Sequence, residues 1–276
     1  MNPHDLTDAD RIDLMEQCFS SVEEVCSQLS DDDWDRLTDL EGWSVKDNLS
    51  HLLSYETIIN GGARAPENID ISSATWVKND FQAFNEREVE WRRATPAKEL
   101  LEEYREVTAA RAKRLREMDD VAWSTDMPTP FGPMPARDMI GIRMMDFFYH
   151  DQDIRRAVGR GGGLDGDVAR VAFHRLSTMA MPRVVVKGSG APDGTTVAFD
   201  ITPEQWAFAI AVDAGRGALV ARPPAPTVRL VCDLATFFCL CGGRWTPERV
   251  KEEGRVTIHG DEALGEKIVD AMTVIP

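Results

Sequence analysis

The chain has 276 residues, of which 43% are hydrophobic and 28% charged, and its formal net charge is −16 at pH 7. This length allows two domains, and the composition is ordinary for a globular protein. The negative charge repels phosphate backbones and anionic lipid headgroups, so we expect neither nucleic acid nor a membrane as a partner. No segment reaches roughly 18 uninterrupted apolar residues, and the first residues lack a signal-peptide pattern, so we expect a cytoplasmic protein.

The first 160 residues carry apolar side chains at helical spacing. The pattern predicts five helices, over residues 8–29, 45–60, 75–94, 97–118 and 135–158. Ser44 is a good N-cap for the second helix, with Asp47 three residues later in capping-box position. Pro96 and Pro135 are expected to open the last two helices. We expect loops over 61–74 and 120–134, and no strand before residue 150.

The composition changes after the glycine-rich stretch at 159–163. One more helix is expected over 165–181, and β-branched runs then alternate between turn residues. These runs predict strands over 183–188, 195–201, 206–212, 227–232 and 255–260. Short helices are expected over 233–241, 246–252 and 261–272. The fold class is therefore α plus α+β, with a helical bundle over 1–160 and a smaller α+β domain over 165–276.

The chain has five cysteines, an odd number whose spacing is not that of a zinc ribbon. Three of them, Cys232, Cys239 and Cys241, lie in an apolar run, where we interpret them as small core residues. This pattern fits a reducing compartment.

Asp146 and His150 are four residues apart on an expected helix, so both lie on one face. A third ligand could come from His51, in the middle of the helix that Ser44 caps, because helical bundles build metal sites from facing helices. The spacing alone is common in a chain with 47 acidic residues, and Asp47 also precedes His51 by four. On spacing alone, a histidine on a helix is more often an ordinary core or surface residue than a metal ligand.

Two stretches, "GWSVKDNLSHLLSYE" and "RMMDFFYHDQDIRRAVG", resemble the DinB-like superfamily and, more narrowly, the mycothiol-dependent maleylpyruvate isomerase family. In that family two histidines and an acid bind a divalent metal, commonly zinc. The resemblance implies this role for His51, Asp146 and His150. The family usually has glutamate where Asp146 stands, one methylene longer, and Asp153 is expected to orient an imidazole or to cap another group. The tail, from "FFCLCGGRWTPERV" onward, resembles a sterol-carrier-like domain.

The resemblance implies a metal-dependent enzyme that uses a low-molecular-weight thiol, mycothiol, as cosubstrate. It would isomerise or S-conjugate a small electrophilic, anionic substrate, as an isomerase or a transferase. We expect Arg222 and Arg244 to supply catalytic positive charge, although both could be solvated or interface arginines. Two alternatives stay open: a metal-dependent hydrolase or thiol-independent lyase or isomerase, and a protein that binds an apolar small molecule through the runs at 206–212 and 228–241.

Overall fold

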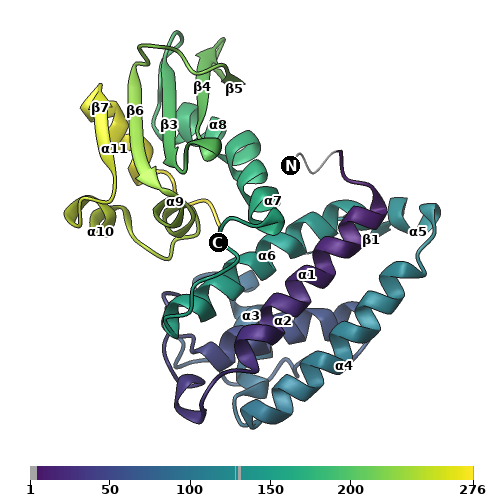
Figure 1. Ribbon diagram of the computed structural model, residues 1–276. Coiled ribbons are helices and arrows are strands. Elements are labelled where there is room, and N and C mark those ends of the chain that lie inside the picture. The colour runs from purple at the N-terminus through teal and green to yellow at the C-terminus, as the bar shows by residue number, and fades with distance from the viewer. Residues whose placement is uncertain (1–4, 128, 130–131, 276) are drawn as a thin grey trace. The chain divides into compact units, whose positions relative to one another are not determined.

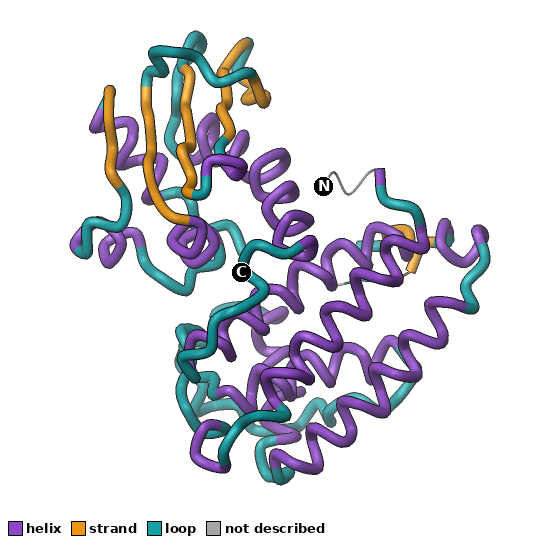
Figure 2. Tube along the Cα trace, in the orientation of Figure 1, coloured by secondary structure: helices purple, strands orange, loops and turns teal. Residues whose placement is uncertain are grey.

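The computed structural model describes residues 5–127, 129 and 132–275. It divides into two compact units, Met1–Val171 and Ala172–Pro276, and the division falls inside helix α7 (Asp167–Arg175). The boundary expected from the sequence lay earlier, between residues 160 and 165. The two units differ in secondary structure: the first is mainly helical, and all five strands of the larger sheet belong to the second (Figures 1 and 2).

The first unit contains four long helices: α1 (Asp8–Cys26), α2 (Val45–Ile59), α4 (Ala97–Arg116) and α6 (Ala136–Ala157). A shorter helix, α3 (Asp80–Arg92), packs outside them. Helix α1 contacts α4 and α6, and α2 contacts the same two helices from the other side, while α3 packs on α2. The long helices therefore form a four-helix bundle, and Figure 1 labels its ribbons.

The interior of the bundle is apolar, because each long helix turns one hydrophobic stripe inward. The stripe of α1 includes Met15 and Val22, that of α2 includes Leu49 and Leu52, and all four side chains are fully buried in one continuous cluster. The predicted capping box at Ser44 and Asp47 is present and fixes the start of α2.

The expectation of no strand before residue 150 is wrong. Two-residue strands β1 (Asp126–Met127) and β2 (Met134–Pro135) pair antiparallel just before α6. A short helix, α5 (Asp120–Ser124), also lies in the region expected to be a loop, where Asp119 caps it by accepting from the backbone N–H of Ala122. Its one turn is too short to show helical periodicity in the sequence.

The second unit is built on a five-stranded sheet with the strand order β5-β4-β3-β6-β7. The strands are β3 (Thr196–Thr202), β4 (Phe208–Asp213), β5 (Arg216–Val220), β6 (Val228–Asp233) and β7 (Thr257–Gly260). The central pair β3–β6 is parallel, and the other neighbouring pairs are antiparallel. Helices α9 (Leu234–Cys241) and α11 (Glu262–Asp270) contact this sheet, and α10 (Pro247–Glu252) contacts both helices.

One predicted strand of the second unit is helical instead. Residues 183–188 continue the helical run that α7 begins, through the π-helical turns Leu176–Ala180 and Val184–Gly188 and the short α8 (Met181–Arg183) between them. Val184 and Val185 are buried there, so packing overrides the β-preference of a valine run. The edge strand β5 was not expected. None of the helices in the described part of the chain combines the length and apolar character needed to span a bilayer.

Candidate metal centre

The structure brings His51, Asp146 and His150 together between α2 and α6. One possible ligand atom from each side chain lies within 4.8 Å of the others. The Nε2 atom of His51 is 3.3 Å from Asp146 Oδ2, and the Nε2 atom of His150 is 3.5 Å from Asp146 Oδ1. The carboxylate therefore lies between two imidazole nitrogens, an arrangement of two nitrogens and an oxygen donor that suits a divalent metal.

Asn48 sets the orientation of the His150 ring. Its Nδ2 donates to the backbone oxygen of Ser44 at 2.8 Å, which leaves Oδ1 to face the Nδ1 of His150 at 2.6 Å. Because that amide oxygen can only accept, the Nδ1 of His150 donates to it, and Nε2 is the ring nitrogen directed toward Asp146. Asp153 Oδ2 is also 3.5 Å from the same Nδ1, but Asn48 is the nearer partner.

The sequence did not single out Asn48. It lies three residues before His51 and so on the same side of α2, and it is completely buried. A polar residue in the apolar stretch of a helix is the signal that could have identified it.

The charge states of the ligands suit metal binding. Burial lowers the pKa of His51 to about 4, so its imidazole is neutral near pH 7, as a ligand must be. Burial alone would raise the pKa of Asp146, but the guanidinium of Arg143 beside it holds that pKa well below its usual range. The Nδ1 atom of His51 is buried and has no hydrogen-bond partner among the described residues.

Trp43 covers one side of the centre. Its ring lies 5.1 Å from the His51 ring and 5.8 Å from the His150 ring, and the His150 pair is stacked. Its indole N–H donates to Glu86 Oε2 at 2.8 Å, and Arg93 holds the other oxygen of Glu86 at 2.9 Å. The ring is therefore fixed and excludes water from that side, whereas the Asp146 side chain is 28% exposed and leaves the centre accessible.

Arg222 and Arg244, expected as catalytic cations, both belong to the second unit. Arg222 is nearly half exposed and pairs with Asp200, which also accepts from Arg229. Arg244 is buried, and its Nη1 donates to the backbone oxygen of Gly242 at 2.7 Å. A catalytic role for either arginine stays a prediction.

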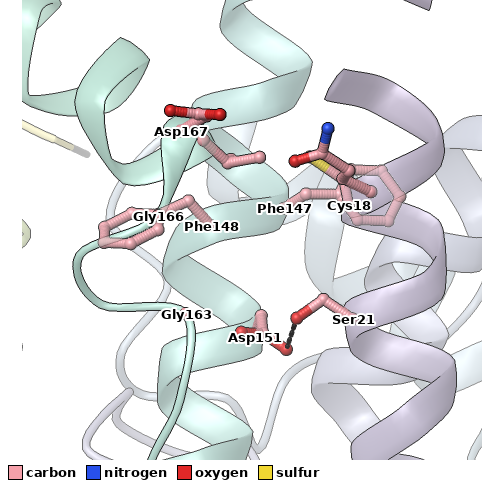
Figure 3. A pocket seen from close by; sticks show the side chains of 10 residues that line it. Cys18, Ser21, Phe147, Phe148, Asp151, Gly163, Gly166 and Asp167 are labelled. Atoms are coloured by element: carbon pink, nitrogen blue, oxygen red, sulfur yellow. Dashed lines mark hydrogen bonds between the residues drawn. The ribbon is translucent and has the colours of Figure 1, made fainter. Parts of the chain in front are cut away.

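A separate hollow lies between α1, α6 and residues 163–168 (Figure 3). Its wall carries Phe147 and Asp151, and the hydroxyl of Ser21 on α1 donates to Asp151 Oδ1 at 3.1 Å. Arg155 Nε also donates to Asp151, at 2.9 Å. The first of these bonds joins α1 to α6, and the second lies within α6. None of the three possible metal ligands lines the hollow.

Comparison with known families agrees with this architecture. Residues 15–155, which are 141 of the 276, match the mycothiol maleylpyruvate isomerase N-terminal domain family. The chain therefore belongs to that family. Residues 191–273 match the SCP-2 sterol transfer family, so a sterol-carrier-like domain follows the bundle, as the sequence predicted.

Two solved structures have a similar fold over nearly the whole chain. Both are crystal structures of a mycothiol-dependent maleylpyruvate isomerase, one of them a variant with a histidine replaced by alanine. The unaltered isomerase is 19% identical to this chain, and the variant is 18% identical. Each comparison covers 94% of this chain and 95% of the other chain, with a TM-score of 0.56. No curated protein matches the sequence. The predicted fold class, a helical bundle followed by an α+β domain, is confirmed.

Proposed function

We propose that this chain is a metal-dependent enzyme that uses a low-molecular-weight thiol, mycothiol or a similar one, to isomerise or S-conjugate a small electrophilic, anionic substrate. His51, Asp146 and His150 would hold the metal, and zinc suits two imidazoles and a carboxylate best. The observation that carries the proposal is the convergence of two imidazole Nε2 atoms on one ionised carboxylate, in a chain that belongs to this family.

The donor set fits a divalent metal. His51 is neutral and Asp146 is ionised near pH 7, so neither has to lose a proton, and Asn48 accepts from the Nδ1 of His150 and leaves its Nε2 for the metal. A bound metal with an open position would lower the pKa of an incoming thiol and favour the thiolate. The fixed ring of Trp43 would keep water from one side of that reaction.

We expect the thiol to be a separate small molecule, because all five cysteines lie in the described part of the chain and none of them is exposed. Burial raises the pKa of Cys18, Cys26 and Cys241 well above the usual value and that of Cys232 to about 12, so these side chains stay neutral thiols. An external thiolate would add to an electrophilic carbon of an unsaturated acid. Elimination of the same thiol after bond rotation gives the isomer, and retention of the new carbon–sulfur bond gives the conjugate. Arg222 and Arg244 would supply positive charge for the substrate's carboxylate.

The test combines metal analysis with turnover. Purified protein should contain about one zinc per chain, and it should convert an unsaturated or epoxide substrate only when a small thiol is added. His150→Ala should lose both the metal and the activity while keeping its helix content. His259→Ala, at an exposed histidine of the second unit, is the matched control and should keep both.

Other outcomes would change the assignment. Full turnover without thiol would overturn the thiol mechanism in favour of metal-activated water, as in a hydrolase, or of a thiol-independent lyase or isomerase. Equal metal content in the unaltered protein and in His150→Ala would overturn the ligand assignment. A protein without metal that carries an apolar ligand would instead be a binding protein.

A further inference from the structure

Arg143 lies three residues before Asp146 on α6 and is 2% exposed. Its Nη1 donates to Asp146 Oδ2, and its Nε donates to Glu56 Oε1 on α2 at 3.0 Å. The guanidinium also lies over the rings of Tyr55 and Phe147, at 4.7 Å and 5.1 Å from their centroids. Two hydrogen-bonded carboxylates and two rings leave this planar group a single orientation.

The anchor of Arg143 is itself fixed. Glu56 is completely buried, and its second oxygen lies 3.2 Å from the Nε atom of Arg111 on α4. Positive and negative side chains thus alternate from Arg111 on α4 through Glu56 on α2 to Arg143 on α6. The last member of this series of charges is Asp146, a possible metal ligand. Buried ion pairs add little to stability compared with apolar residues of the same volume, so stability alone does not account for this series of charges.

The contact with Arg143 distinguishes the two oxygens of Asp146. Oδ2 accepts from the guanidinium and also lies 3.3 Å from the Nε2 of His51, whereas Oδ1 faces the Nε2 of His150 and has no contact with Arg143. We propose that Arg143 is a positioning residue of the metal centre: it holds Oδ2, so that Asp146 offers the metal one oxygen, Oδ1, rather than two. This inference rests on the proposed function and deepens it. A carboxylate that donates one oxygen leaves a further coordination position for thiol or substrate, which a catalytic metal requires.

The test measures the metal rather than the reaction. Arg143→Gln should weaken zinc binding by about 10- to 100-fold, the usual effect of removing a partner of a ligand. In the cobalt-loaded protein the visible absorption should weaken, because a freed second oxygen raises the coordination number. Arg143→Lys keeps the charge but cannot reach both Glu56 and Asp146, so it should change the spectrum in the same direction.

Arg155→Gln is the matched control. Arg155 is also buried on α6, at 8% exposure, and also donates to a carboxylate, that of Asp151, but it touches none of the proposed ligands. This variant should keep the unaltered zinc affinity and cobalt spectrum. Circular dichroism verifies folding, and Arg143→Lys carries the test if the glutamine variant does not fold.

The failures of the two proposals are distinguishable. If the unaltered protein binds no zinc or cobalt, the proposed function is wrong, and this inference with it. If the unaltered protein binds metal and a folded Arg143 variant has the same zinc affinity and cobalt spectrum, only the positioning role is overturned. An Arg155→Gln variant with the same losses as Arg143→Gln would also overturn it, because any buried arginine of α6 would then have that effect.

Discussion

His51 should make the metal-free protein sensitive to mild acid. The side chain is 3% exposed, and burial lowers the pKa of its imidazole from 6.5 to about 4. Above the unfolded value of 6.5 the ring is neutral in both states and has no effect on the free energy of unfolding. As the pH falls below that value, the unfolded chain binds a proton that the folded chain excludes, so stability is lost progressively down to the folded pKa.

The size of this loss follows from the two pKa values. Between pH 7 and about pH 5 the fraction of unfolded chains protonated at this site rises from about a quarter to nearly one, and the linkage relation gives a loss of about 2 kcal/mol. At about pH 4 the loss approaches 3 kcal/mol. This is a substantial part of the stability of an ordinary domain, which is about 5–15 kcal/mol.

The assay is urea unfolding of chelator-treated protein at both pH values, followed by far-ultraviolet circular dichroism. His51→Gln cannot titrate, so it should lose about 2 kcal/mol less than the unaltered chain between pH 7 and about pH 5. His259→Gln, at an exposed position, should retain the full loss. If the unaltered chain and His51→Gln lost equal stability over this interval, His51 would not be a buried neutral imidazole. The argument that His51 can bind a metal near pH 7 without losing a proton would then be refuted.

Three further outcomes are expected. Asp146→Asn should lower kcat/KM and zinc affinity by more than about 100-fold, because an amide is a weak ligand. Asp146→Glu should retain more of both quantities. Steady-state kinetics measures kcat/KM, and chelator competition measures the zinc affinity. Cys18 and Cys26 should not react with an aromatic disulfide reagent near pH 8 until the protein is unfolded, since burial keeps them as thiols; reaction in the folded state would contradict this. Zinc at about 100 times its dissociation constant should add about 2.7 kcal/mol of stability, and an unchanged Tm after chelation would contradict folded-state binding.

The sequence predicted the long helices well, because each has a wide apolar stripe and a recognisable cap such as Ser44. It failed where local preference and packing disagree: Val184 and Val185 lie in a valine run typical of a strand, yet the burial of that run in helical turns decides its structure. The edge strand β5 was missed because most of its side chains are exposed and no apolar alternation marks it.

Of the candidate site, too, only some residues could be predicted from the sequence. Helical spacing made His51, Asp146 and His150 candidates, and the family resemblance singled them out. Arg143 and Asn48 could not be predicted, because the roles we infer for them depend on partners on a neighbouring helix. Periodicity shows which side of a helix a residue occupies, but it does not show which residue of another helix stands opposite.

Helices α2 and α6 meet through three polar pairs: Asn48 with His150, His51 with Asp146, and Glu56 with Arg143. As the numbers rise along α2 they fall along α6, so the two helices are antiparallel here and the pairs are spread over about 12 Å of helix. Apolar side chains would tolerate sliding by a turn, about 5.4 Å, whereas such a slide would separate all three pairs at once. These buried polar residues therefore select a single register of the two helices, and that register brings the two imidazoles and the carboxylate together.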